Sequence, residues 1–261
     1  MTETPPATTK LSTHTLDKLY LRDLDLVEEA MGRMSFTEAA YYHVLGRRPT
    51  PGQVAVLDAV LVTLMEHGLT PSAIATRMTA LSTPEAPQAA IAAGLLNVGS
   101  QFVGTTEDVA RLLARCMAAA DGFDTAARAE VAELRAARKA IPGFGHHLHR
   151  PDDPRSPKLF EIALAQDGIT GEHVRALQRL GGIVDEAVGR HLTINATGAT
   201  AAVLLDSGIP VEAMRGFAVV ARAAGLLAHL VEERATPTAM RIWQTVEDAI
   251  PYDGGAEVPE D

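Results

Sequence analysis

The chain has little cysteine, few aromatic residues and no excess of positive charge. Cys116 is its only cysteine, which excludes an intramolecular disulfide and a four-cysteine zinc site and is typical of the reducing cytoplasm, where we expect the protein. Aromatic residues amount to 4% and alternating β-branched runs do not occur, so little β-structure is expected. The formal net charge of −10 lacks the basic excess that a general nucleic-acid-binding protein needs.

Long apolar segments are missing as well. No run of 18 apolar residues occurs, because Arg, Glu or His interrupts the Ala- and Leu-rich stretches, so no membrane span is expected. The first ten residues are rich in Thr and Pro without an apolar core, unlike a signal peptide. We expect residues 1–12 to be disordered and the acidic segment 253–261, which contains Gly and Pro, to be a mobile tail.

What the sequence does contain is a succession of helix signals. Ser35 and Glu38 have the spacing of a capping box, and Thr50, Pro51 and Gln53 combine a cap, a proline at the first helical position and a glutamine three residues after the cap. Apolar residues recur at helical spacing behind these caps, with abundant Ala and Leu. The pattern predicts an all-α fold. The predicted helices cover about 35–45, 50–64, 71–81, 87–97, 105–120, 124–140, 156–166, 171–189, 195–206, 211–233 and 238–248.

Two of the predicted helices are apolar around most of their circumference, at residues 89–96 and 217–230. A helix without a polar face needs neighbours on all sides or a partner subunit. We therefore expect a homodimer that forms through such helices.

The most informative segment is residues 141–155, which reads Ile-Pro-Gly-Phe-Gly-His-His-Leu-His-Arg-Pro-Asp-Asp-Pro-Arg. Gly143 and Gly145 allow the backbone to approach a ligand closely, and His146 offers an imidazole that exchanges protons near neutral pH. Arg150 and Arg155 add guanidinium groups, which bind carboxylates and phosphates. Together these groups are suited to hold an anion and to transfer a proton beside it.

Arg222 is a second candidate on physical grounds alone. It lies in an otherwise apolar helical segment, residues 217–225, where a buried guanidinium is costly unless an anion binds it. That anion is either the carboxylate of a ligand or a structural partner such as Glu232 or Glu233. The sequence does not decide between them.

These segments resemble the citrate synthase superfamily. Its hallmark, Gly-Phe-Gly-His followed after a few residues by Asp-Pro-Arg, is similar to residues 143–146 and 153–155. Further resemblance, in the same order along the chain, is found in a Gly-Arg-x-Pro-Thr turn at 46–50, a His-Gly step at 67–68, Ile194-Asn195 ahead of a small-residue helix, and the segment 217–229. The resemblance covers residues 17–235, and the short length is closest to the compact citryl-CoA lyase-like proteins.

The resemblance implies a citrate synthase-like fold with a large helical domain and a smaller inserted one. By position, the large domain comprises residues 13–103 and 201–252 and the small domain residues 104–200. The active site would lie in the cleft between them, in each subunit of a homodimer. The implied substrates are an acyl-CoA and a di- or tricarboxylate, with coenzyme A as part of the substrate or product, no metal ion, and neither nucleic acid nor membrane as partner.

The resemblance also assigns roles to particular residues. His146 matches the catalytic histidine that contacts the substrate oxygen at the carbon where the C–C bond forms or breaks; the alternative is a loop histidine bonded to a nearby carbonyl. His67, Arg155 and Arg222 match ligands of substrate carboxylates, although the dipole at a helix C-terminus would also favour a histidine at position 67. Coenzyme A is expected to bind to Gly143, Phe144, Gly145, Arg150 and Lys139. Solvated surface charge is the alternative for Arg150 and Lys139.

Two positions depart from the family pattern. Phe102 stands where the family has its second catalytic histidine, and Thr197 stands where it has the catalytic aspartate. In the synthases this pair enolises the acyl-CoA, but phenylalanine cannot donate a proton and threonine is not a base at neutral pH. Condensation at synthase-like rates is therefore not expected, whereas the first step of cleavage needs only His146 as a base. Water, Thr197, Gln101 or His147 would then protonate the enolate.

Three functions agree with these observations. The first is a citryl-CoA lyase-like enzyme that cleaves a C–C bond in a 3-hydroxy-3-carboxylate acyl-CoA, such as citryl-CoA, to acetyl-CoA and a 2-oxo acid. The second is an acyl-CoA enzyme with another substrate, and the third is a CoA-thioester-binding protein without turnover. A metal site at His146, His147 and His149 is disfavoured, because their spacing is not that of a zinc-binding helix. The acyl group and the direction of reaction stay open.

Overall fold

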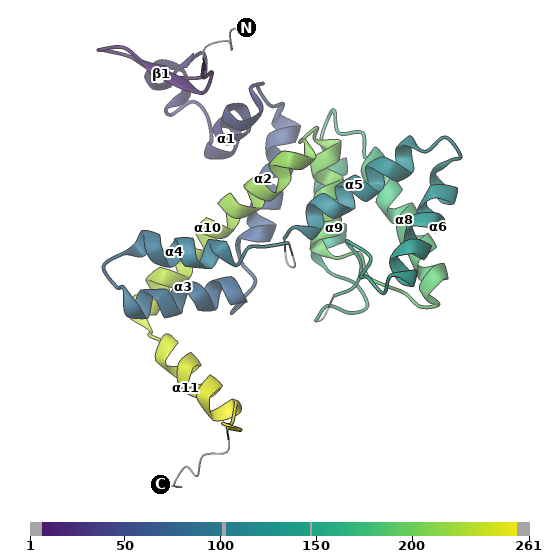
Figure 1. Ribbon diagram of the computed structural model, residues 1–261. Coiled ribbons are helices and arrows are strands. Elements are labelled where there is room, and N and C mark those ends of the chain that lie inside the picture. Colours follow the sequence, from purple (N-terminus) through teal and green to yellow (C-terminus); the bar gives the residue numbers. More distant parts are fainter. Residues whose placement is uncertain (1–6, 101–102, 147, 255–261) are drawn as a thin grey trace, which may run out of the picture. The chain divides into compact units, whose positions relative to one another are not determined.

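The computed structural model describes residues 7–100, 103–146 and 148–254 (Figure 1). Over these residues, eleven α-helices and one π-helix make up nearly all of the regular structure, which confirms the predicted all-α fold. The chain forms two compact units, residues 1–63 with 104–217 and residues 64–103 with 218–261. These boundaries differ from those of the predicted large and small domains, and that functional division stays a prediction.

The first unit begins with a small antiparallel sheet that the sequence pattern does not predict. Its strands have only two or three residues, too few for a recognisable alternation: β1 (Ser12–His14), β2 (Leu19–Leu21) and β3 (Leu24–Asp25). Thr15 closes the first turn, since its hydroxyl accepts the N–H of Lys18 at 3.1 Å and donates to Asp17 at 2.8 Å. Ser12, at the end of the segment expected to be disordered, is thus part of the sheet, while residues 1–6 and 255–261 lie outside the described residues.

Both predicted N-terminal caps are confirmed in the first unit. The hydroxyl of Ser35 accepts the N–H of Glu38 at 3.1 Å. Thr50 and Gln53 cap each other, because each side chain accepts the backbone N–H of the other residue at 3.2 and 2.9 Å. The elements in this part of the chain are η1 (Leu26–Ala30), α1 (Phe36–Leu45) and α2 (Pro51–Met65).

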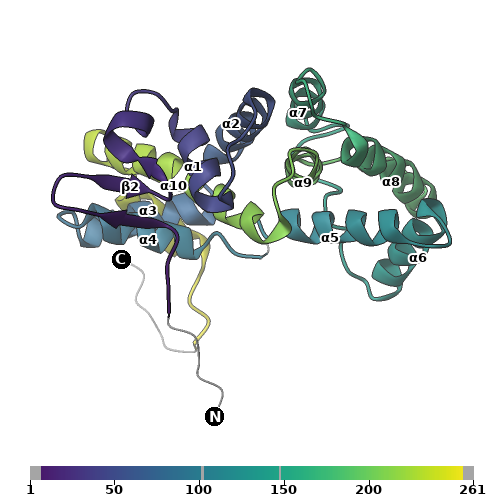
Figure 2. The ribbon, with the colours of Figure 1, turned by 90° about the horizontal axis from the view of Figure 1, so that it is seen from above.

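The central helix of the first unit is α9 (Ala196–Asp206). It contacts α5 (Thr105–Ala118), α7 (Arg155–Leu164) and α8 (Glu172–Val188), and it lies between them in Figure 2. Residues 199–204 are fully buried, and most of their side chains are small, which lets the neighbouring helices approach closely. The first turn of this buried helix carries part of the candidate site.

The helix α6 (Phe123–Ala136) packs on α5 and α8 and ends earlier than the predicted residue 140. Arg138 has a φ of 53°, in the left-handed region. The N–H of Lys139 donates to the carbonyl of Leu134 at 2.9 Å. This left-handed turn ends the helix, in the manner of a C-terminal cap.

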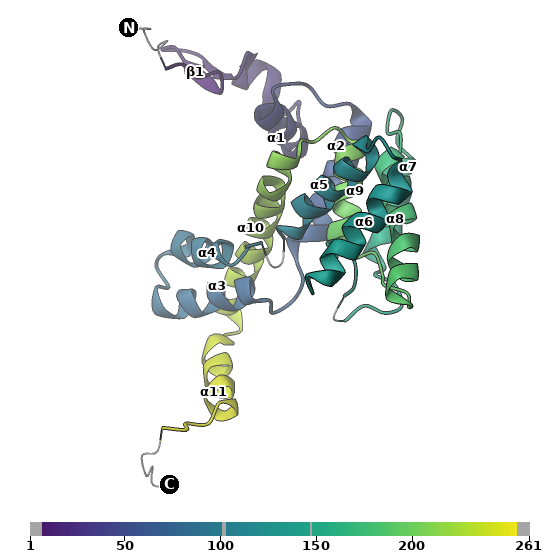
Figure 3. The ribbon, with the colours of Figure 1, turned by 45° about the vertical axis from the view of Figure 1, so that its right-hand side comes forward.

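The second unit contains α3 (Pro71–Ser82), α4 (Pro87–Leu96), the second part of α10 (Val211–Ala235) and α11 (Ala239–Ala249). The helices α3 and α4 lie side by side, and α11 contacts α3 (Figure 3). Gly94 lets α4 pack closely, because a Cβ at this position would lie 2.1 Å from Oγ1 of Thr76 and 2.6 Å from the side chain of Leu226. Small residues thus set the helix spacing here as well.

By length and composition alone, α10 is the one helix among the described residues that could cross a membrane. Core helices of water-soluble proteins pass the same test, and half of the apolar window of α10 is buried inside the structure. Val220, Leu227 and Val231 on this helix are nevertheless 43%, 50% and 60% exposed. The homodimer expected from such an apolar helix stays a prediction.

Candidate functional site

The glycine loop and the first turn of α9 form the framework of the candidate site in the first unit. Gly143 and Gly145 have φ values of 84° and 79°, which favour glycine. A Cβ on Gly143 would lie 3.1 Å from the Cα of Gly198, and a Cβ on Gly198 would lie 2.7 Å from the carbonyl oxygen of Gly143. The absence of side chains therefore lets the loop rest directly on the start of α9.

Asn195 caps α9 and ties the loop to it. Its Oδ1 accepts the N–H of Gly198 at 3.1 Å, and its Nδ2 donates to the carbonyl of Gly145 at 2.9 Å. Its backbone N–H donates to the carbonyl of Gly143 at 3.0 Å. Phe144, between the two glycines, is buried and forms a β-bridge with Ile194. The loop is thus held on both sides of Phe144.

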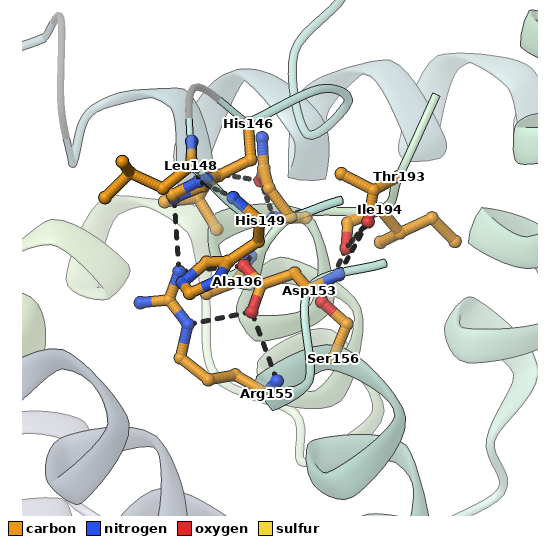
Figure 4. A network of polar contacts seen from close by, with 12 residues as sticks. His146, Leu148, His149, Asp153, Arg155, Ser156, Thr193, Ile194 and Ala196 are labelled. Carbon is orange, nitrogen blue, oxygen red and sulfur yellow. Dashed lines mark hydrogen bonds and ion pairs between the residues drawn. The ribbon is translucent and has the colours of Figure 1, made fainter. Parts of the chain in front are cut away.

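Asp153 anchors Arg155 beside this loop (Figure 4). The fully buried carboxylate accepts Nε–H and Nη2–H of Arg155 at 2.9 and 2.8 Å and the N–H of Ala196 at 3.0 Å. The N–H of Asp153 donates to Oγ1 of Thr193 at 2.8 Å. Burial alone would raise the pKa of Asp153, but the hydrogen bonds and the positive charge of Arg155 outweigh it and lower the pKa. An ionised carboxylate therefore fixes Arg155, whose side chain stays 25% exposed.

His146 is oriented by the backbone that follows it. Its Nδ1 accepts the N–H groups of Leu148 and His149 at 3.1 and 3.0 Å, and its ring centroid lies 4.4 Å from that of His149. Its Nε2 lies 3.4 Å from Nη2 of Arg155 (Figure 4). Because Nδ1 acts as the acceptor, the neutral ring carries its proton on Nε2, which is the nitrogen suited to donate a proton to a ligand oxygen. The structure thus brings together two of the predicted site residues, His146 and Arg155.

Thr197 lies in the first turn of α9. Its hydroxyl donates to Oδ1 of Asn195 at 2.7 Å and accepts the hydroxyl hydrogen of Thr105 at 3.0 Å. Both contacts are with neutral groups, and the hydroxyl proton of Thr197 lies in its hydrogen bond to Asn195. Phe102 is the other position that departs from the family pattern, and Gln101 and His147 are candidate proton donors to the enolate. All three lie outside the described residues.

In the second unit, His67 follows the end of α2 and is half-buried. The carboxylate of Glu66 accepts the N–H of His67 at 2.7 Å and that of Gly68 at 2.5 Å. Burial raises the pKa of Glu66, but these hydrogen bonds and the contact with His229 outweigh it and lower the pKa. The position of His67 just beyond the C-terminus of α2 agrees with both predictions. His67 is either a ligand of a substrate carboxylate or a histidine favoured by the helix dipole.

Arg222 lies on α10 and is 9% exposed. Its Nη1 is buried without a hydrogen-bond partner among the described residues. Glu232 and Glu233, the structural partners that the sequence leaves open, contact Arg77 instead, with 2.8 Å between Nη1 of Arg77 and Oε2 of Glu233. Burial lowers the pKa of Arg222, and the charge of Glu66 opposes this effect. A buried guanidinium with an unpaired N–H is suited to bind a carboxylate.

The residues predicted to bind coenzyme A all lie in the first unit. Gly143 and Phe144 are buried, Gly145 is half-buried, and Arg150 and Lys139 are exposed. Exposed cations are accessible to phosphates, but the same exposure fits solvated surface charge. Their role therefore stays a prediction. It also stays a prediction that one cleft joins the site residues of the two units, which are His146 and Arg155 in the first and His67 and Arg222 in the second.

Several residues that build these sites receive no role from the sequence. Asp153 and Asn195 lie within the recognised motifs, but only the structure shows that they anchor Arg155 and the glycine loop. Arg77 carries the same signal that identifies Arg222. It is a charged residue at helical spacing from apolar residues, here Ala73 and Ala80, and it is 2% exposed.

Comparison with known proteins gives an independent test of the resemblance. The family described as "Citrate synthase, C-terminal domain" matches residues 8–244. Citrate synthase from Synechocystis sp. is 27% identical over 205 residues, which cover 77% of this chain and 50% of that relative. The chain spans about half the length of the curated relatives it matches.

Solved structures show the same relationship. Citryl-CoA lyase from Hydrogenobacter thermophilus is 29% identical with a TM-score of 0.82, and the match covers 98% of this chain and 97% of that chain. ATP citrate lyase from Methanothrix soehngenii, in complex with citrate and coenzyme A, shares the fold with a TM-score of 0.78 at 18% identity, over 98% of this chain and 43% of that chain. The family match extends over most of the sequence and the fold agrees with it, so the chain belongs to the citrate synthase family.

Proposed function

We propose that the protein is a citryl-CoA lyase-like enzyme, which cleaves a C–C bond in a 3-hydroxy-3-carboxylate acyl-CoA such as citryl-CoA to give acetyl-CoA and a 2-oxo acid. The observation that carries this proposal is the match with citryl-CoA lyase over nearly the full length of both chains. Thr197 supports it, because a hydroxyl that donates to Asn195 is not the enolising base that a synthase needs.

His146 is the proposed base. To take the proton of the tertiary hydroxyl, Nε2 must carry no proton of its own, so in the reacting state the ring proton lies on Nδ1 and the hydrogen bonds from the N–H groups of Leu148 and His149 are broken. The C–O bond then becomes a carbonyl as the C–C bond breaks, and the bonding electrons pass into the enolate of the thioester. A proton added to the enolate carbon completes acetyl-CoA. The candidates for this final donor are water, Thr197, Gln101 and His147. Of these, Thr197 would first have to give up its hydrogen bond to Asn195.

The two arginines are proposed to bind carboxylates of the substrate. Arg155 is fixed by Asp153 and partly exposed, and Arg222 keeps an unpaired N–H in a buried position. His67 is proposed as a further carboxylate ligand. The glycine loop, with Arg150 and Lys139, is proposed to bind coenzyme A through backbone N–H groups and phosphate contacts.

The test is incubation of the purified protein with citryl-CoA and a panel of other acyl-CoA thioesters, with products identified by mass spectrometry. We expect acetyl-CoA and oxaloacetate from citryl-CoA. His146→Ala is expected to lower kcat by about 10²–10⁴-fold, the usual effect of losing a general base, while thioester binding is retained. His14→Ala, on the exposed strand β1, is the control that should keep full activity.

Other outcomes would favour the other functions. Turnover of a different thioester, with none of citryl-CoA, would indicate an acyl-CoA enzyme with another substrate. Tight binding of thioesters without any product would indicate a binding protein. Unchanged turnover in His146→Ala would contradict the proposed mechanism.

A further inference from the structure

Arg222, Gly225 and His229 share one face of α10, because they are three and four residues apart. Gly225 brings this face against the end of α2. A Cβ at Gly225 would lie 2.0 Å from the carbonyl oxygen of Met65 and 3.3 Å from Oε2 of Glu66. This face of α10 therefore contacts the turn that follows α2, within the second unit.

His229 connects this turn to Arg77. Arg77 donates from Nε and Nη2 to Nδ1 of His229 at 3.1 and 2.8 Å. On the other side of the ring, Nε2 lies 2.9 Å from Oε2 of Glu66, in a close contact that is not well aligned as a hydrogen bond. A guanidinium has donors only, so Nδ1 is the acceptor and the ring proton lies on Nε2, facing Glu66. His229 and Arg77 are 9% and 2% exposed, so water competes little with the contact between them, whereas the side chain of Glu66 is 46% exposed.

Arg77 is fixed in turn from its far side. Its Nη1 donates to Oε2 of Glu233 at 2.8 Å and to Oγ1 of Thr238 at 3.1 Å, and its Nη2 contacts Glu232. The contacts thus form a continuous series from the start of α11 through Arg77 and His229 to Glu66. Every member belongs to the second unit.

We infer that His229 and Glu66 are positioning residues for the substrate-carboxylate ligands His67 and Arg222, an inference that rests on the proposed function of those two ligands. The Nε2–H group of His229 attracts the carboxylate of Glu66 at 2.9 Å. Glu66 in turn holds the backbone of His67 and Gly68 against the face of α10 that carries Arg222. Because Glu66 is engaged by these groups, it balances the charge of Arg222 without occupying its Nη1, which is left to a substrate anion.

Binding and kinetic measurements test this positioning role. His229→Phe removes the Nε2–H group, so we expect the Kd for citrate and the KM for citryl-CoA to rise about tenfold, with kcat nearly unchanged. His229→Gln places an amide N–H near the position of Nε2 and is expected to restore most of the affinity. His173→Gln is the matched control, because His173 pairs with Asp206 in the first unit; it should lower stability without changing the Kd for citrate.

Nuclear magnetic resonance gives a readout that does not depend on turnover. Long-range proton–nitrogen correlation spectra of protein with isotope-labelled histidine distinguish a proton on Nε2 from one on Nδ1. We expect His229 to carry its proton on Nε2. Glu66→Gln is expected to shift the Nε2 resonance of His229 and to leave the resonances of His173 in place.

The outcomes separate this inference from the proposed function. A proton on Nδ1 of His229, citrate affinity unchanged in His229→Phe, or equal losses in the Phe and Gln variants would each overturn the positioning role. A wild-type protein that does not bind citrate would overturn it too, since no carboxylate site would then exist to be positioned. A wild-type protein that binds citrate but does not cleave citryl-CoA would overturn only the lyase function.

Discussion

Asp153 and Glu233 are buried carboxylates that each hold an arginine. Asp153 binds Arg155, two residues later at the start of α7, whereas Glu233 binds Arg77, which lies 156 positions earlier in the chain. A short motif places the first pair together, but the second depends on how α3 and α10 pack. For this reason the sequence predicts Arg155 as part of a site, yet leaves open whether Arg222 pairs with an acid of its own helix.

Glu233 makes the stability of the protein depend on pH in the acid range. Its carboxylate is 8% exposed and accepts hydrogen bonds from Thr238, Ala239 and Arg77. Burial raises its pKa, but these hydrogen bonds outweigh it and lower the pKa from 4.5 to about 2. Because the folded-state pKa lies below the unfolded one, the stabilisation is fully present above pH 4.5 and is lost as the pH falls toward 2. It amounts to about 3 kcal/mol.

Urea unfolding at a series of pH values from neutral to acid measures this effect. Glu233→Gln is expected to lower the free energy of unfolding by about 3 kcal/mol at neutral pH. The difference from wild type should shrink as the pH approaches 2. Glu247→Gln, on the exposed side of α11, is the control and should behave like wild type. A difference that stays constant with pH would show that Glu233 does not titrate in this way.

At the scale of elements, most of the fold follows from local signals. The helix bounds agree with the predicted ones because caps and apolar spacing act within a few residues, as at Ser35 and Thr50. The exceptions are the small sheet at Ser12–Asp25, the π-helix η1 that follows it, and the early end of α6, where Arg138 adopts a left-handed conformation. The strands and η1 have at most five residues each, too few for a recognisable apolar period.

The contact between α9 and the glycine loop is also invisible to local patterns. Gly198 is an ordinary small residue of an Ala-rich helix in the sequence, but in the structure its side-chain position is occupied by the backbone of Gly143. The family motif predicts the importance of the loop, whereas only packing explains why α9 begins with a glycine in its first turn. The candidate site in the first unit depends on this contact.

Gly198→Ala tests that dependence. The new Cβ would lie 2.7 Å from the carbonyl oxygen of Gly143, a backbone atom that cannot rotate away. We expect a loss of about 1–3 kcal/mol in the free energy of unfolding and a lower kcat, because the loop carrying His146 must move. Gly216→Ala is the matched control. Gly216 is helical, and a Cβ added there would have no atom within 4 Å, so alanine should raise the free energy of unfolding of the protein by about 0.5–1 kcal/mol. Full activity and stability of Gly198→Ala would show that the close approach is not needed.

At the scale of the whole molecule, the predicted site residues divide between the two units. His146 and Arg155 belong to the first, and His67 and Arg222 belong to the second. No local pattern indicates that residues so far apart in the sequence bind one substrate. The expectation that they do comes from the family resemblance alone. What each unit shows by itself is a charged group held in place by hydrogen bonds: Arg155 by the buried carboxylate of Asp153, and Glu66 by the backbone of the turn that follows it.

The exposed apolar face of α10 leads us to propose a homodimer. Val220, Leu227 and Val231 are spaced seven and four residues apart, so they form one stripe, and each is 43–60% exposed. An uncovered apolar stripe of this kind favours association. Leu227→Glu places a charge in the stripe and should yield monomers in size-exclusion chromatography with light scattering. Val44→Glu, at a 51% exposed position on α1, should leave the dimer intact. A monomeric wild-type protein would show the proposal to be wrong, and a Leu227→Glu dimer would place the interface on another surface.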